Sequence, residues 1–117
     1  MKIQMIADLL QADILAGADK LESEVHSACG SDMMSDVLAY VKNQAVLLTG
    51  LVNAQVIRTA DMMDMRCIVF VRNKRPNEEM LALADESGLV VLASPMRMYE
   101  ACGLLYQNGL CPQREHE

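Results

Sequence analysis

Three short runs of mostly apolar residues recur in the second half of the chain, at residues 45–49, 67–71 and 89–93. Each run is continuous and does not alternate with polar residues, which is typical of strands covered on both faces of a parallel sheet. Parallel neighbours need a crossover connection, usually a helix, and helical patterns separate these runs. The sequence therefore predicts an α/β fold: a three-layer α/β/α sandwich with a mainly parallel sheet and right-handed crossovers.

The flanking residues predict where the other elements begin and end. Asn53 and the Pro76-Asn77 pair are expected to start helices, Ser87-Gly88 to end the second of these, and Ser94-Pro95 to open a last helix reaching about Asn108. In the first half we expect helices over 2–11 and 33–42, extended segments over 12–17 and 25–29, and a turn at Gly30-Ser31-Asp32 with a helix cap. Residues 1–110 then form a single domain and 111–117 a polar C-terminal tail.

Composition excludes several classes of partner. The 117 residues carry a formal net charge of −6, and aromatic residues make up only 3%. A chain of this kind lacks the basic surface and stacking rings of a nucleic-acid-binding protein, and it has no polybasic segment for an anionic membrane. Gln4 and Asp8 interrupt the apolar N-terminus, and no apolar run reaches the ~20 residues that span a bilayer, so we expect a cytoplasmic protein without a signal peptide.

Four cysteines, Cys29, Cys67, Cys102 and Cys111, lie far apart without a Cys-x-x-Cys pair. We expect them to be reduced in the cytosol and to hold no metal or other cofactor. Ten methionines are more than a small core needs, and neighbours such as Met62 and Met63 cannot both face inward from one helix. Some of them are therefore expected at a subunit interface, most simply that of a homodimer.

Ligands of parallel α/β sheets bind beyond the carboxyl ends of the strands, where helix N-termini converge. The loops at 49–53, 72–77 and 94–96 should meet there, joined by the Gly30-Ser31-Asp32 turn. Gly50 suits close approach of the backbone to a ligand, Asn53 would cap a helix beside it, and Arg72, Lys74 and Arg75 supply positive charge for an anion. The candidate ligand-binding residues are Asp32, Thr49, Gly50, Asn53, Arg72, Arg75 and Ser94.

A purely structural interpretation stays open, in which Gly50 permits a turn, Asn53 only caps a helix and the basic loop faces solvent. The chain contains no phosphate-binding loop, no dinucleotide fingerprint, no nucleophile elbow and no central histidine to serve as a base. The sequence therefore predicts no catalytic site and no enzyme activity.

Stretches along most of the chain resemble the DRTGG domain family, particularly its short stand-alone members. They are residues 30–39, 47–53 and 56–60 together with 98–103, and the resemblance covers about residues 1–110. It implies a compact α/β/α domain similar to the N-terminal domain of HPr kinase and to regulatory domains of phosphotransacetylases and CBS-domain pyrophosphatases. The loop Thr49-Gly50-Leu51-Val52-Asn53 departs from the motif that names the family, because it lacks the Asp-Arg pair and the double Gly.

We expect a non-catalytic regulatory or protein-interaction module, homodimeric, that binds a small anionic ligand such as a nucleotide at the strand-end loops. The alternative, implied by the short family members, is an accessory protein of an anaerobic, iron-only hydrogenase-type redox system that uses Cys29, Cys67 and Cys102.

Overall fold

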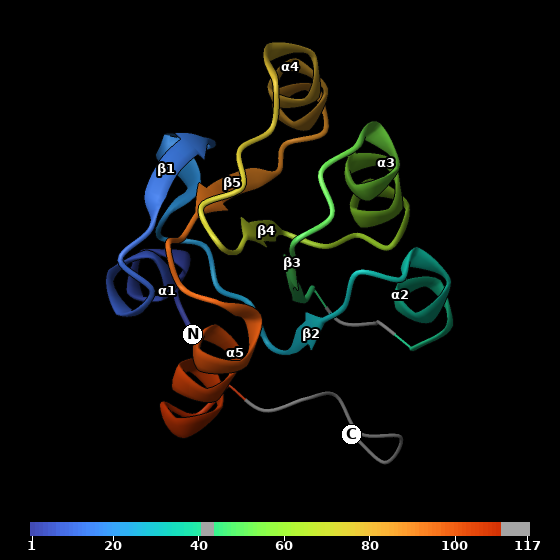
Figure 1. Ribbon diagram of the computed structural model, residues 1–117. Helices are drawn as coiled ribbons and strands as arrows, with labels where there is room; N and C mark the ends of the chain where they lie inside the picture. The colour runs from blue at the N-terminus through green and yellow to red at the C-terminus, as the bar shows by residue number, and fades with distance from the viewer. Residues whose placement is uncertain (41–43, 111–117) are drawn as a thin grey trace.

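The computed structural model describes residues 1–40 and 44–110 (Figure 1). The elements in chain order are α1 (Ile3–Leu9), β1 (Asp13–Ala16), the 3-10 turn η1 (Ala18–Lys20), β2 (Ala28–Gly30), α2 (Met34–Tyr40), β3 (Val46–Thr49), α3 (Ala54–Met62), β4 (Cys67–Phe70), α4 (Glu78–Glu86), β5 (Val90–Ala93) and α5 (Met98–Gln107). The predicted end of the second helix near residue 42 and the predicted C-terminal tail lie outside the described residues.

The strands form one five-stranded sheet in the order β1-β5-β4-β3-β2. The four strands from β2 to β5 are parallel, and β1 pairs antiparallel with β5 at one edge. The three apolar runs are β3, β4 and β5, and all their residues are buried, as expected of strands covered on both faces.

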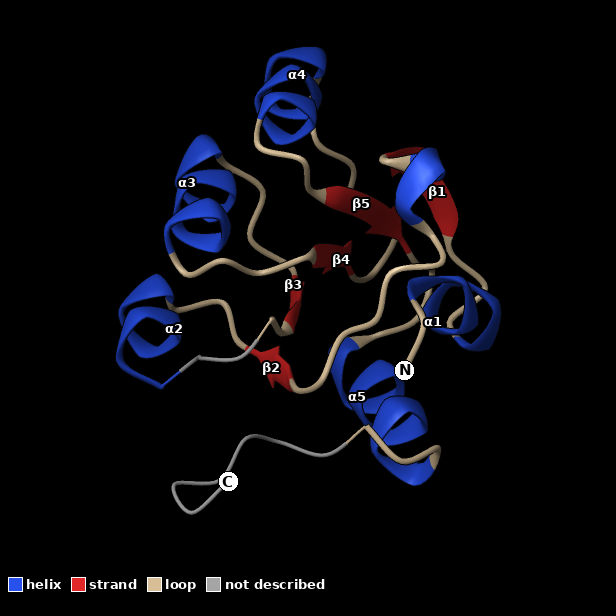
Figure 2. Ribbon diagram, turned by 180° about the vertical axis from the view of Figure 1, so that it is seen from behind, coloured by secondary structure: helices blue, strands red, loops and turns tan. Residues whose placement is uncertain are grey.

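Alternate residues of each strand enter two separate cores. Val46, Val69 and Leu92 face α1 and α5, whereas Leu47, Ile68 and Val91 face α2, α3 and α4. Figure 2 shows the two groups of helices on opposite faces of the sheet. The predicted three-layer α/β/α sandwich with a mainly parallel sheet is confirmed.

The extended segment predicted over 25–29 starts later than expected. Val25 is fully buried, but its amide donates to the Met1 carbonyl, and a bridge pairs Lys2 with Glu24. Residues 24 and 25 are therefore paired with the N-terminal segment and not with β3. Pairing with β3 begins only at Ala28, so β2 is short and lies at the open edge of the sheet.

The last helix also starts later than predicted, at Met98 instead of Ser94-Pro95. The carbonyls of Ser94 and Met96 accept hydrogen bonds from Asn73 and Arg72, both at 2.7 Å. Because these two carbonyls accept hydrogen bonds from another loop, they do not accept the amides of a first helical turn. Residues 94–97 therefore form a loop at the end of β5. Among the described helices, none is long and apolar enough to cross a membrane.

Candidate functional site

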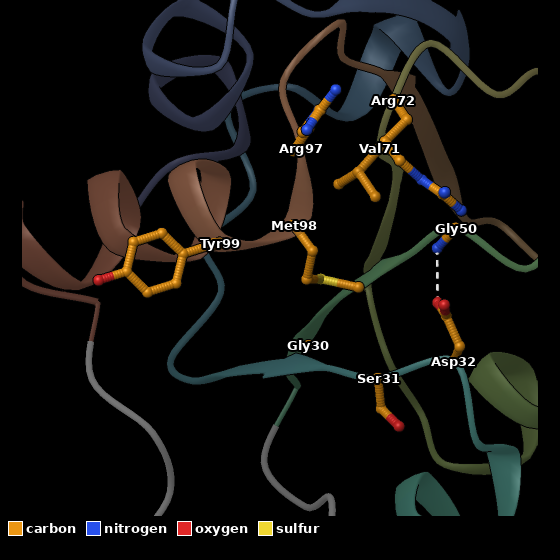
Figure 3. A pocket seen from close by; sticks show the side chains of 9 residues that line it. All are labelled: Gly30, Ser31, Asp32, Gly50, Val71, Arg72, Arg97, Met98 and Tyr99. Atoms are coloured by element: carbon orange, nitrogen blue, oxygen red, sulfur yellow. Dashed lines mark hydrogen bonds between the residues drawn. The ribbon is translucent and has the colours of Figure 1, made fainter.

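A hollow of about 490 Å³ lies beyond the carboxyl ends of the four parallel strands (Figure 3). Its walls come from the loops after β2, β3 and β4 and from the start of α5. We call it the strand-end hollow; it is lined by Gly30, Ser31, Asp32, Gly50, Val71, Arg72, Arg97, Met98 and Tyr99. Its position is the one at which parallel α/β sheets bind ligands, and its volume lies within the range of small-molecule sites.

Asp32 joins the loop after β2 to the loop after β3. Its Oδ1 accepts a hydrogen bond from the Gly50 amide at 2.7 Å and another from the Thr49 hydroxyl at 2.9 Å. The Gly50 hydrogen bond lowers the pKa of the Asp32 carboxyl, with smaller contributions from Thr49 and the Arg72 charge, against partial desolvation. Asp32 is therefore an exposed, ionised carboxylate with a fixed orientation.

The Thr49 hydroxyl is fully engaged in this arrangement. Thr49 is completely buried, and besides donating to Asp32 its oxygen accepts the Leu51 amide at 3.1 Å. The hydroxyl positions the carboxylate from behind and does not itself line the hollow. At the start of α2 it is the Ser31 hydroxyl that accepts an amide hydrogen bond, from Met33 at 3.0 Å, while Asp32 turns toward Gly50.

Arg72 lies in a tight turn with an unusual backbone. Arg72 and Asn73 both have φ of +57°, and the Lys74 amide donates to the Val71 carbonyl at 3.1 Å, as in a type I′ turn. For Arg72, left-handed backbone costs about 1–2 kcal/mol. The hydrogen bonds from the Arg72 and Asn73 amides to the loop after β5 hold the turn in place.

The turn places the Arg72 guanidinium over Gly50 (Figure 3). A Cβ atom built on Gly50 would lie 2.6 Å from Arg72 Nη2. Glycine at position 50 therefore leaves room for the arginine side chain. The group that lies close to Gly50 in the structure is the Arg72 guanidinium, and close approach of a ligand to the Gly50 backbone stays a prediction.

The N-terminus of α5 forms the remaining wall. Its N-cap residue is Arg97, whose side chain makes no capping hydrogen bond, so the first-turn amides of this ten-residue helix keep their partial positive charge. Within the described residues, no carboxylate lies within 4 Å of the guanidinium of Arg72 or Arg97. Two arginines and a helix N-terminus thus bring positive charge to a hollow that also holds the Asp32 carboxylate, and Glu100 lies in the first turn of the same helix.

The predicted site residues fall into two groups. Asp32, Gly50 and Arg72 line the hollow, and Thr49 lies directly behind it. Three others lie elsewhere. Asn53 caps α3 by accepting the Val56 amide, Arg75 forms an ion pair with Asp13, and buried Ser94 donates to the Leu10 carbonyl at 2.7 Å.

Sequence reasoning missed Arg97, Met98 and Tyr99 because it began the last helix three or four residues too early. That placement put them inside a helix instead of at its exposed start. A signal was present nonetheless: Tyr99 is one of only four aromatic residues in the chain, and its side chain is 93% exposed.

The described cysteines do not gather into a cluster. Cys67 is buried in β4, and Cys29 and Cys102 are half-buried. Burial raises the pKa of all three thiols, which disfavours the thiolate that binds metals. In the part of the chain that the structure describes, no three Cys, His, Asp or Glu side chains are placed to hold a metal ion. Cys111 lies outside the described residues, and the redox alternative stays a prediction.

Comparison with known proteins identifies the family of this α/β domain. The model of the DRTGG domain matches residues 5–107, and the chain belongs to this family. A similar solved structure is that of the CBS and DRTGG domains of the regulatory region of Clostridium perfringens pyrophosphatase, complexed with its activator diadenosine tetraphosphate. A search of curated proteins finds no match.

That structure shares 14% sequence identity with this chain at a TM-score of 0.73, over 91% of this chain and 46% of the other. This degree of likeness establishes the shared fold. The present chain spans about half the length of the one it resembles. The expected resemblance to the DRTGG family, and to the CBS-domain pyrophosphatase in particular, is confirmed.

Proposed function

We propose that this DRTGG domain is a non-catalytic, cytoplasmic regulatory module that binds a nucleotide in the strand-end hollow. The observation that carries the proposal is that Arg72, Arg97 and the N-terminus of α5 meet at one hollow, and that among the described residues no carboxylate forms an ion pair with either arginine. Such a group of donors suits phosphate oxygens, because guanidinium forks and helix N-termini both stabilise anions.

Two further features support a nucleotide over a simple anion. The hollow, at about 490 Å³, is large enough for a small organic ligand, and its floor includes the apolar side chains of Val71 and Met98. Tyr99 also lines the hollow, and its exposed ring, which points away from Arg72 and Asp32 (Figure 3), offers a surface on which a base could stack. The regulatory region of the similar pyrophosphatase was solved with a dinucleotide activator, which supports a regulatory role for nucleotides in proteins of this family.

Isothermal titration calorimetry with ATP, GTP and diadenosine tetraphosphate tests the proposal, with adenosine and inorganic tripolyphosphate as partial ligands. Arg72→Gln and Arg97→Gln should each weaken nucleotide binding about 10- to 100-fold, the effect of losing a hydrogen bond to a charged group worth about 1.5–3 kcal/mol. Arg58→Gln, at an exposed position on α3, is the control with the same change of charge.

Arg75→Gln separates the two interpretations of the basic loop. Because Arg75 pairs with Asp13 away from the hollow, its substitution should leave binding unchanged. No heat of binding for any nucleotide at millimolar concentration would contradict the proposed function. Equal losses in the Arg58 and Arg72 variants would show that binding is non-specific.

We further propose that the module is a homodimer that uses apolar side chains of the neighbouring helices α2 and α3. Met33 directly before α2, Leu38 in α2 and Met62 in α3 are 61%, 41% and 71% exposed. Light scattering across micromolar concentrations should report a dimer that Met62→Lys dissociates. Met5→Lys, on α1 at the opposite face of the sheet, should leave it intact. A monomer at all concentrations would contradict this part of the proposal.

A further inference from the structure

The strand-end hollow carries charge of both signs. Arg72 and Arg97 line it from the loop after β4 and the start of α5, and Asp32 lines it from the loop after β2. A site for a bare phosphate or polyphosphate gains nothing from a carboxylate, because the negative charge repels the ligand. The presence of Asp32 therefore indicates that another part of the ligand offers a hydrogen-bond donor.

The geometry of Asp32 suits this task. Both of its hydrogen bonds, from the Gly50 amide and the Thr49 hydroxyl, end on Oδ1. Within the described part of the chain, no close hydrogen bond ends on Oδ2 and no cation lies within 4 Å of the carboxylate, although the Leu51 amide and the Arg72 charge make smaller contributions to its lowered pKa. An ionised carboxylate only accepts hydrogen bonds. Oδ2 is thus an acceptor of fixed orientation, with room for a further hydrogen bond, on a residue that lines the hollow.

A nucleotide carries both complementary groups, because its phosphates are anionic and its ribose carries two hydroxyl donors. In other parallel α/β sheets, a carboxylate on a neighbouring strand end holds the ribose while the phosphates lie at a helix N-terminus. Here the carboxylate and the helix N-terminus also follow different strands, but two strands separate them. Asp32 follows the edge strand β2, and the helix N-terminus follows β5, on the other side of β3 and β4.

We infer that Asp32 accepts a hydrogen bond from a ribose hydroxyl of the ligand, so that the site selects ribonucleotides over deoxyribonucleotides and over polyphosphate. The inference rests on the proposed function, since it assigns one residue of the same site. Thr49 acts through Asp32 as a positioning residue, because its buried hydroxyl fixes the carboxylate without lining the hollow.

The test compares ATP and GTP with their 2′-deoxy and 3′-deoxy analogues and with inorganic tripolyphosphate, by calorimetry on the full chain. The wild-type protein should bind at least one of the two deoxy forms about tenfold more weakly than the ribonucleotide, because the acceptor is left without a partner. Asp32→Asn keeps an Oδ1 acceptor for the Gly50 amide. It should reduce the preference to less than about twofold and strengthen tripolyphosphate binding, because the repulsion is removed.

Asp36→Asn is the matched control: it removes the same charge from an exposed position on α2 outside the hollow, and the preference should remain. Loss of the ribose preference in Asp32→Asn distinguishes a contact with the ligand from a structural role or a general effect of charge, because neither of these discriminates between ribose and deoxyribose. Equal affinity of the wild type for ribo- and deoxyribonucleotides would overturn the inference and leave the proposed function standing. Absence of all nucleotide binding would overturn both.

A divalent cation is the competing occupant for Oδ2, and the same titrations in magnesium and in EDTA address it. The inference expects the preference for ribose to persist in EDTA. Binding that requires magnesium, and that is indifferent to both deoxy substitutions, would assign Asp32 to a metal and overturn the inference.

Discussion

Replacement of Gly50 by alanine should weaken ligand binding without unfolding the protein. The new Cβ would lie 2.6 Å from Nη2 of Arg72 and 3.4 Å from its Cζ and Nε, so the guanidinium must move away. The Arg72 backbone cannot follow, because its amide is bound to the Met96 carbonyl at 2.7 Å. We therefore expect only the Arg72 side chain to move away from the loop after β3.

The two consequences have different magnitudes. The obstructing atoms are the far end of a flexible side chain, and Gly50 has no left-handed backbone, so the free energy of unfolding should stay within about 1 kcal/mol of the wild type. The displaced guanidinium forfeits a charged hydrogen bond to the ligand worth about 1.5–3 kcal/mol. The dissociation constant for ATP should therefore rise about 10- to 100-fold.

Calorimetry with ATP and denaturant unfolding measure the two quantities on the same samples. In an Arg72→Gln background, Gly50→Ala should have no further effect on binding, because both changes remove one contact. Gly103→Ala is the control, since its Cβ would meet no atom within 4 Å and alanine favours the interior of α5 by about 0.5–1 kcal/mol. Unchanged affinity in Gly50→Ala, or a loss of several kcal/mol in stability, would refute the reasoning.

Three further predictions concern stability. Gly17→Ala should destabilise the fold by more than about 2 kcal/mol in denaturant unfolding, because Gly17 has φ of +79° and its Cβ would lie 2.9 Å from the backbone Cα of Val90. Ser94→Ala should cost about 1–3 kcal/mol, since it leaves the buried Leu10 carbonyl without its hydrogen bond; an unchanged melting temperature would contradict this. The lowered pKa of Asp32 means that its stabilising contribution is complete above the ordinary pKa of about 4 and is lost as pH falls through the folded-state pKa. Asp32→Asn should therefore show a shallower loss of stability below about pH 4 than the wild type, and parallel curves would count against the Asp32 hydrogen bonds.

The sheet could be predicted from the sequence because its signal is local and strong. Each of the runs at β3, β4 and β5 must be buried on both faces, and helices between parallel strands follow from chain geometry. Capping by Asn53 and Asn77 was equally accessible, and both side chains accept the amide three residues ahead. The conclusion that strand-end loops converge needs only the parallel order of the strands.

The composition of the site could be predicted only in part, because it depends on contacts between distant loops. No residue pattern near Arg72 indicates that it adopts a left-handed backbone conformation. Nor does the sequence indicate that the amides of Arg72 and Asn73 donate to the carbonyls of residues 96 and 94, so that α5 begins only at Met98. That delay brings Arg97 to the hollow. Arg75, in the same basic loop, instead forms an ion pair with Asp13 on the edge strand β1. A cluster of basic residues in the sequence therefore does not predict which of its arginines lines the hollow and which forms an ion pair elsewhere.

Titration of the isotope-labelled protein with ATP, followed by backbone amide chemical shifts, tests the central claim most directly, because it locates the ligand residue by residue. We expect saturable changes in the amide chemical shifts of Ser31, Gly50, Arg72 and Tyr99, with little change at Gly88 near the opposite ends of the strands. Shifts that cluster away from the strand-end hollow, or no shifts at millimolar ATP, would contradict it.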